Sequence, residues 1–276
     1  MKAWRDYPYP AGAVIGNRYR IEMLLGEGSY GLTYRCRDTR DGAVLALKQS
    51  RPSKGEAGRR MLGRESSILQ AMDHPNIPGS RDYFRYKGEN WLASDYIAGK
   101  TLEDLIFDEQ VVYGERECLA VTLRLMELVK HVHARGYVHL DLRIPNVILR
   151  EEELYLIDFG LAREIGETDI LPPDPERNRA WKWKWPPKPK EEEPPSPPLP
   201  EIASDLYDAG QLMLFMLYSG FKPERGAAER HWREELSLSP GMLQLLEKLL
   251  GEQGTLVYTD TGDFVREAEE LYKCLM

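Results

Sequence analysis

The chain has 276 residues, 42% of them hydrophobic and 30% charged, which is typical of a globular protein large enough for two lobes with cores of their own. Its net charge of −8 argues against a nucleic-acid-binding protein, because phosphate binding needs clustered Lys and Arg. No apolar run approaches the roughly 18 residues of a membrane span, and the three widely spaced cysteines lack metal-ligand spacing. We therefore expect a cytoplasmic protein with reduced thiols, no transmembrane segment and no nucleic-acid partner.

The first third of the chain predicts a small, mainly antiparallel β-sheet with one helix. Residues 18–50 alternate like three strands, with Asp41-Gly42 as the turn between the second and the third. A helix is predicted over about 56–72. It ends before Pro75, because proline cannot continue a helix. Its apolar stripe consists of Met61, Leu62, Ile68, Leu69 and Met72. Residues 80–97 predict two further strands.

From Thr101 the pattern becomes mainly helical. Thr101-Leu-Glu-Asp104 has the spacing of a capping box, and a long amphipathic helix is predicted over 115–135, ending at Gly136. Short strands and loops follow over 137–160. Three further helices are predicted over 205–219, 239–250 and about 263–274.

A proline-rich stretch, residues 171–200, separates these regions. It holds 11 of the 19 prolines and three of the six tryptophans, so it cannot form a regular helix or a central strand. Trp181-Lys-Trp-Lys-Trp185 is interpreted as part of a solvated loop whose rings pack back on the larger lobe. The alternatives are a docking segment for a partner or substrate, a membrane-surface contact and a nucleic-acid stacking strip.

Gly26-Glu-Gly-Ser-Tyr-Gly31 is a glycine-rich motif that, by itself, also fits dinucleotide-binding folds, where it opens a helix. Here a strand pattern follows it, which favours a flap over nucleotide phosphates, approached by backbone N–H groups. An ordinary glycine-rich hairpin is the other interpretation.

Lys48 ends an apolar strand 17 residues after Gly31, and Glu65 follows 17 residues later on the predicted helix. We predict an ion pair between them that holds the ammonium against the α- and β-phosphates of ATP. The alternatives are a solvated strand end for Lys48 and a surface carboxylate for Glu65, with Arg64 and Glu56 as competing charges.

His139-Leu-Asp-Leu-Arg-Ile-Pro-Asn146 and Asp158-Phe-Gly160 carry the groups that phosphoryl transfer needs. Asp141 can accept or orient a hydroxyl proton, and Arg143 can bring a cation to the transferred group. Asn146 and Asp158 offer the oxygen ligands that Mg²⁺ prefers. Any one of these could be a turn residue, but two polar clusters 12 residues apart are hard to explain as turns.

In this order the motifs resemble those of a eukaryotic-type (Hanks-type) serine/threonine protein kinase, and the opening Gly16-Asn-Arg-Tyr-Arg-Ile21 resembles the bacterial branch. The resemblance covers about residues 14–276. It implies an α+β, two-lobed fold with ATP between the lobes. The division would be an N-terminal extension over 1–13, a small β-rich N-lobe with one helix over 14–94, and a larger, mainly helical C-lobe over 95–276. The C-lobe would include an atypical Pro/Trp-rich activation segment at about 158–201.

The resemblance also implies the role of individual residues. Ser94 matches the gatekeeper, and Asp95 and Ile97 match the hinge that binds adenine. Thr33 and Ala46 match the adenine roof, Ile148 its floor, and Asp205 a buried Asp that binds the catalytic-loop backbone. The implied ATP-binding set is Gly26, Glu27, Gly28, Ser29, Tyr30, Gly31, Thr33, Ala46, Lys48, Ser94, Asp95, Ile97 and Ile148.

Besides Thr33, which replaces the family's usual Val, three positions depart from the family pattern. Leu140 replaces an Arg that often pairs with an activation-loop phosphate, and Thr168 and Ser196 are the only Ser or Thr between 161 and 200. Arg143 replaces the usual Lys, whose geometry differs from that of a planar guanidinium. Glu201, the remnant of the Ala-Pro-Glu motif, lies only four residues before Asp205.

These observations predict an ATP- and Mg²⁺-dependent kinase, with Mn²⁺ as an alternative metal, that acts on Ser and Thr of a protein substrate without Arg-mediated control by loop phosphorylation. Residues 171–200 are a candidate docking segment. The alternatives are a pseudokinase-type ATP-binding scaffold, favoured by Leu140 and the eroded segment end, and a kinase for a small hydroxyl-bearing molecule.

Overall fold

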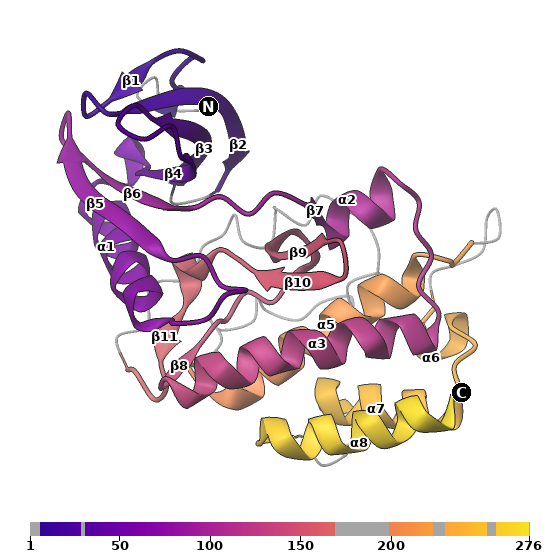
Figure 1. The fold of residues 1–276 in the computed structure, drawn as a ribbon. Coiled ribbons are helices and arrows are strands. Elements are labelled where there is room, and N and C mark those ends of the chain that lie inside the picture. Colours follow the sequence, from indigo (N-terminus) through magenta and orange to yellow (C-terminus); the bar gives the residue numbers. More distant parts are fainter. Residues whose placement is uncertain (1–5, 29–30, 169–198, 223–229, 253–257, 276) are drawn as a thin grey trace. The chain divides into compact units, whose positions relative to one another are not determined.

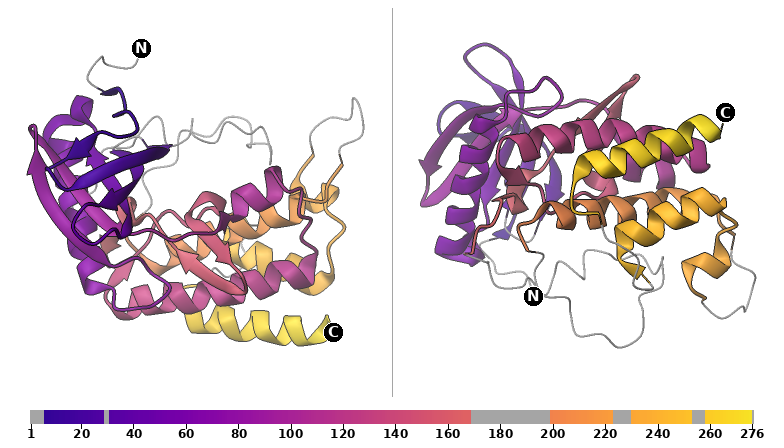
Figure 2. Two further views of the ribbon diagram at one scale, coloured as in Figure 1. Left: turned by 45° about the horizontal axis from the view of Figure 1, so that its top comes forward. Right: turned by 90° about the horizontal axis from the view of Figure 1, so that it is seen from below.

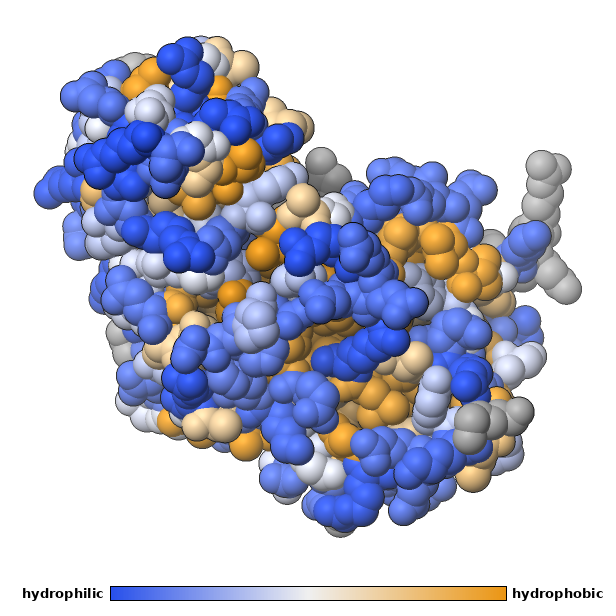
Figure 3. Space-filling model, viewed as in Figure 1, coloured by the Kyte–Doolittle hydropathy of each residue, from blue (hydrophilic) through white to orange (hydrophobic). Residues whose placement is uncertain are grey.

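The computed structural model describes residues 6–28, 31–168, 199–222, 230–252 and 258–275. These form two compact units, one made of the residues up to Ala98 together with Asp158–Ala162, the other of Gly99–Ile157 and Arg163 onward. The predicted lobe boundaries stay a prediction, and the 158–162 segment that we assigned to the C-lobe groups with the first unit. None of the described helices is long and apolar enough to cross a membrane. On the face shown in Figure 3, polar side chains cover much of each unit.

The first unit is built on a six-stranded sheet, in which every neighbouring pair is antiparallel. The spatial order is β1-β2-β3-β4-β6-β5. The strands are β1 (Val14–Ile15), β2 (Tyr19–Glu27), β3 (Gly31–Asp38), β4 (Val44–Ser50), β5 (Ser80–Tyr86) and β6 (Glu89–Asp95). This confirms the predicted sheet, including the turn at Gly42, which has a positive φ of 79°. β1 was missed, because two residues are too few to show an alternating pattern.

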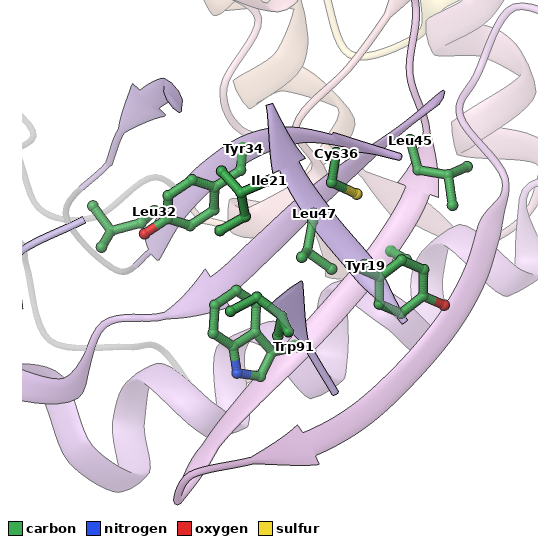
Figure 4. Close-up of a cluster of buried hydrophobic side chains, with 10 residues drawn as sticks. Tyr19, Ile21, Leu32, Tyr34, Cys36, Leu45, Leu47 and Trp91 are labelled. Atoms are coloured by element: carbon green, nitrogen blue, oxygen red, sulfur yellow. The ribbon is translucent and has the colours of Figure 1, made fainter. Parts of the chain in front are cut away.

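Aromatic and aliphatic side chains form the core on one face of this sheet (Figure 4). Trp91 is completely buried, and its ring lies 6.1 Å from that of Tyr34 and 6.5 Å from that of Phe84, centroid to centroid. Stacked and tilted rings of this kind give large apolar burial with a defined geometry. Because alternate residues of each strand are held in this core, the residues between them must point to the opposite face of the sheet.

The helix of this unit, α1 (Gly55–Ala71), packs on β4, β5 and β6 (Figure 1). A 3₁₀ turn, η2 (Pro52–Lys54), leads into it. Its stripe of Met61, Leu62, Ile68 and Leu69 is buried as predicted, and Glu65 is buried within the same stripe. A carboxylate at such a position needs a partner, because an unpaired buried charge is costly.

The second unit is mainly helical. Its helices are α2 (Leu102–Phe107), α3 (Glu115–Ala134), α5 (Ile202–Tyr218), α6 (Trp232–Glu235), α7 (Pro240–Leu250) and α8 (Thr261–Cys274). α3 contacts α5 and α8, and α5 contacts α7; Figure 2 shows α8 alongside α3. The Thr101 capping box is present, and the long helix ends before Gly136 as predicted. The predictions for the later helices are confirmed, although α5 begins three residues before the expected start at 205.

Short elements of the second unit carry the sequence from His139 to Asn146. β9 (Val147–Arg150) pairs with β10 (Glu153–Leu156) and β7 (Lys100–Thr101), while β8 (Tyr137–Val138) pairs with β11 (Arg163–Glu164). The loop between β8 and β9 ends in a 3₁₀ turn, η3 (Ile144–Asn146). The loop is thus anchored at both ends by β-pairing. Ser29, Tyr30, Ser196 and Trp181–Trp185 lie outside the described residues.

Candidate active site

One face of the first unit's sheet collects several of the predicted ATP-binding residues. Thr33 on β3 pairs with Lys48 on β4, and Ala46, two residues before Lys48, pairs with Ser94 on β6. Paired residues, and residues two apart on a strand, project on the same face of a sheet. Leu47 points into the core. The opposite face of the sheet therefore carries Thr33, Ala46, Lys48 and Ser94.

The Lys48 ammonium lies between two carboxylates. Its Nζ is 2.8 Å from Oε2 of Glu65 and 2.7 Å from Oδ1 of Asp158. Glu65 is 5% exposed, whereas the side chain of Asp158 is 45% exposed. The predicted Lys48–Glu65 pair is confirmed, and neither competing charge replaces it, since Glu56 instead pairs with Arg59.

Electrostatics keep this ammonium charged. Burial would lower the pKa of Lys48, but the negative charges of Asp158 and Glu65 outweigh it and raise the pKa above its ordinary value. Lys48 is thus a fixed positive charge at neutral pH, and a fixed positive charge on a sheet face is suited to binding phosphate.

Asp158 can approach Lys48 because it lies in a tight turn and is followed, two residues later, by a glycine without a side chain. Asp158 has a φ of 61° and caps η4 (Phe159–Leu161), where its Oδ1 accepts from the Gly160 N–H at 3.2 Å. A Cβ at Gly160 would lie 3.1 Å from both the Lys48 Nζ and that oxygen. Glycine at 160 therefore permits the close approach of the ion-paired groups.

The glycine-rich motif joins β2 to β3, as predicted, and not a strand to a helix. The Gly28 N–H donates to the Gly31 carbonyl at 2.9 Å. A Cβ at Gly31 would meet the Gln49 carbonyl at 2.9 Å, whereas one at Gly26 would meet nothing within 4 Å. Glycine is thus required at position 31, because the Gln49 carbonyl on the neighbouring strand β4 leaves no room for a Cβ. At Gly26, by contrast, the described residues leave the space next to the backbone empty. The hairpin geometry fits a flap and excludes the dinucleotide-binding strand-to-helix form.

The predicted hinge begins at Asp95, the last residue of β6, and continues beyond the strand to Ile97. The Asp95 carboxylate is engaged by Arg81, whose Nε lies 2.5 Å away, and by the Gly79 N–H at 3.0 Å. The Asp95 carboxylate is therefore occupied by partners within the first unit, and the Asp95 N–H donates to the Gly79 carbonyl at 3.1 Å. Ile97 also belongs to the first unit, whereas Ile148, buried on β9, belongs to the second.

In the second unit, two of the predicted polar residues, Arg143 and Asn146, contact Asp141. Arg143 places Nε 2.6 Å from Oδ1 and donates from Nη2 to Oδ2 at 2.8 Å. The Asn146 amide nitrogen donates to the same Oδ2 at 2.8 Å and to the Asp141 carbonyl at 2.9 Å. Asp141 is therefore held in place by a forked cation and an amide, as a positioned catalytic carboxylate would be.

Asp205 fixes the backbone of this loop from α5. Its Oδ2 accepts from the His139 N–H at 2.9 Å, and its Oδ1 from the Leu140 N–H at 2.7 Å. Leu140 has a φ of 60°, a left-handed conformation that is costly for a branched side chain. The two hydrogen bonds to a fully buried carboxylate offset that cost, and the backbone-binding role expected of Asp205 is present.

A further partner of Asp205 was missed from the sequence. His133, near the end of α3, has its Nε2 2.8 Å from Oδ2 of Asp205 and its Nδ1 2.9 Å from Oγ1 of Thr261. Thr261 is the first residue of α8, so this histidine links three helices to the loop. Its sequence signal is weak, because a lone histidine near a helix end has many structural uses.

The departures from the family pattern have visible structural consequences. Leu140 is an uncharged side chain that is only 4% exposed, whereas Thr168 and Glu201 are both exposed. Glu201 occupies the N-cap position of α5 without making a side-chain capping bond.

Restoring the family residue at 140 should destabilise this unit. Leu140→Arg would bury a guanidinium at a left-handed position, so we expect a loss of about 2–4 kcal/mol in the free energy of unfolding. Leu140→Met, which conserves volume, should cost less than about 1.5 kcal/mol. Urea denaturation monitored by tryptophan fluorescence measures both, and equal midpoints for the two variants would contradict the buried placement of Leu140.

Comparison with known proteins gives the same assignment as the geometry. The family model for the protein kinase domain matches residues 19–173. The "Probable serine/threonine-protein kinase YbdM" of Bacillus subtilis is 32% identical over 248 residues, which are 89% of this chain and 87% of that protein. The "Probable serine/threonine-protein kinase SCO3848" of Streptomyces coelicolor is 28% identical over 161 residues, 56% of this chain and 24% of that protein.

Among solved structures, the PknI kinase domain of Mycobacterium tuberculosis aligns with a TM-score of 0.65 and 19% identity, covering 95% of this chain and 99% of that domain. At that identity the match supports the fold. The fold, the order of the motifs, the family model and the similarity to YbdM lead to one conclusion: the chain belongs to the Hanks-type protein kinase family, within its bacterial serine/threonine branch.

Proposed function

We propose that this chain transfers the γ-phosphate of ATP to Ser and Thr hydroxyls of a protein substrate. The observation that carries the proposal is the pair of charged constellations, Lys48 with Glu65 and Asp158 in one unit and Asp141 with Arg143 and Asn146 in the other. Phosphoryl transfer is catalysed mainly by positioning and electrostatic stabilisation, which fixed charges of this kind supply.

On the ATP side, Lys48 would bind the α- and β-phosphates, and Glu65 would keep its ammonium in place. The backbone of 26–31 would cover the phosphates, with Ser29 and Tyr30 at its tip. Thr33 and Ala46 would contact one side of adenine and Ile148 the other, next to Ser94 and the backbone of Asp95 and Ile97.

On the acceptor side, Asp141 would orient the substrate hydroxyl and accept its proton. Arg143, which contacts Asp141, would also reach the transferred phosphoryl group with its guanidinium. Both groups are presented by a loop whose backbone Asp205 fixes, so their positions are set before substrate binds.

Protein kinases normally use Mg²⁺ with ATP, and the donor atoms of this chain fit that ion. The Asp158 carboxylate and the Asn146 amide oxygen are the hard ligands that Mg²⁺ prefers, and Mn²⁺ accepts the same set. Because the amide nitrogen of Asn146 donates to Asp141, the amide oxygen is the atom offered to a metal. The ion would neutralise charge on the phosphates.

The scaffold and the small-molecule kinase are less favoured, since similarity to serine/threonine protein kinases covers most of the chain. Residues 171–200 stay a candidate docking segment on sequence grounds. A cytoplasmic location is also part of the proposal, supported by the three free cysteines Cys36, Cys118 and Cys274.

Removing either key charge should abolish phosphate transfer. Asp141→Asn removes the proton acceptor and Lys48→Met removes the phosphate-binding cation, so we expect each to lower kcat/KM by at least about 100-fold. Transfer of labelled phosphate from ATP to a protein substrate measures the loss, and circular dichroism verifies folding. Lys100→Met, at an exposed lysine paired with Glu109, is the control that should retain activity. Wild-type rates in either variant would overturn the assignment.

Activity should also be independent of activation-loop phosphorylation. Because Leu140 offers no cation for a loop phosphate, we expect exhaustive phosphatase treatment to change kcat by less than about twofold. The comparison uses one preparation, assayed before and after treatment, with mass spectrometry to confirm phosphate removal. A loss of activity that is reversed by rephosphorylation would contradict this prediction, because it would show that a group other than residue 140 binds the loop phosphate.

A further inference from the structure

An N-terminal segment outside the matched kinase region is built into the first unit. This strap, residues 6–13, precedes the 19–173 match and was expected to be an extension. The Gly12 N–H donates to the Ile21 carbonyl, and the Ile21 N–H donates to the Ala13 carbonyl, both at 2.8 Å. The strap therefore joins the backbone network at the edge of β2.

Aromatic contacts anchor the middle of the strap to the core. The Tyr9 ring lies 5.7 Å from that of Trp91, and the Tyr9 N–H donates to the Tyr34 hydroxyl at 3.2 Å. That hydroxyl donates to Oε1 of Gln49 at 3.2 Å. Burial raises the pKa of Tyr34 to about 12, so the hydroxyl keeps the proton that it donates at neutral pH. Figure 4 shows Tyr34 and Trp91 within the core.

Asp6 supplies a cap that the local sequence lacks. It is 3% exposed, and its carboxylate accepts from the Ser53 N–H at 3.0 Å and the Ser53 hydroxyl at 2.5 Å. Ser53 lies in η2, whose own N-cap residue makes no side-chain capping bond. Asp6 thus caps the turn that leads directly into α1, the helix that carries Glu65.

Arg51 extends this contact to the glycine-rich loop. Its Nη1 lies 3.5 Å from Oδ2 of Asp6. On its other side, Nε and Nη2 donate to the Gly28 carbonyl at 3.1 and 2.8 Å. The Arg51 side chain is 13% exposed and that of Asp6 4%, so both charges are largely shielded from solvent. One guanidinium therefore connects a buried carboxylate of the strap to the base of the phosphate flap.

We infer that Arg51, held by Asp6, is a positioning residue that sets the glycine-rich loop for ATP binding, which makes the strap part of the catalytic unit. The inference rests on the proposed ATP-dependent function. In this inference Arg51 makes no contact of its own with nucleotide or substrate. It acts by holding the Gly28 carbonyl, while the Gly28 N–H donates to the Gly31 carbonyl, so that less ordering entropy is lost at Gly28 when ATP binds.

The test compares Arg51→Ala, next to the Gly31–Ser50 end of the β3–β4 pair, with a matched arginine at the opposite end of that pair. Arg37 also bridges a carboxylate and a glycine carbonyl, through Glu22 and Gly42, both at 2.9 Å, but in the hairpin away from the flap. We expect Arg51→Ala to raise the Kd for Mg-ATP by about 3- to 10-fold in titration calorimetry, the loss of one or two hydrogen bonds. The KM for ATP should rise by the same factor, whereas the KM for the protein substrate should stay unchanged. Arg37→Ala should alter the melting temperature alone.

Asp6→Asn tests the coupling. It should raise the Kd for Mg-ATP less than Arg51→Ala does, and the double variant should be weaker by less than the product of the two factors, because both changes act on one contact. Equal Kd values for wild type and Arg51→Ala, or the same change in Arg37→Ala, would overturn the inference. Failure of the wild type to bind Mg-ATP would instead overturn the proposed function.

Discussion

The ion pairs of the Lys48 ammonium with Glu65 and Asp158 are the interaction on which the first unit's site depends. Strand alternation places it on the face opposite the aromatic core, and the apolar stripe of α1 brings Glu65 to it. Glycine at 160 lets Asp158 approach from a third segment. Three elements distant in sequence thus meet at one cation, which orders the helix and the Asp158 turn around the charge that would bind phosphate.

Asp205 plays the equivalent part in the second unit. A carboxylate with no exposed surface holds two successive N–H groups of the loop, one of them on a leucine in a left-handed conformation. His133 and Thr261 extend the same network to α3 and α8. The loop that presents Asp141 is therefore tied to the helical core, which explains how a strained backbone persists at this position.

Sequence reasoning predicted the elements whose pattern is local. The stripe of α1, the capping box at Thr101 and the strands β2–β6 all have periodic or turn signals of their own, and Glu65 was predicted from its spacing after Lys48 on that helix. The two-residue strands β1, β7 and β11 were missed, because long-range pairing defines them. The contacts of Asp6, Arg51 and His133 were missed for the same reason. Their partners lie far away in the sequence, so no local spacing of residue types indicates them.

The central claim is that the two charged constellations form a working Ser/Thr protein kinase. It is tested most directly by incubating the wild-type chain and Asp141→Asn with ATP labelled at the γ-phosphate and a protein substrate mixture, then hydrolysing the labelled protein for phosphoamino-acid analysis. The account predicts phosphoserine and phosphothreonine with the wild type and neither with the variant. ATP bound without transfer to protein, or label appearing in small molecules and not in protein, would contradict it.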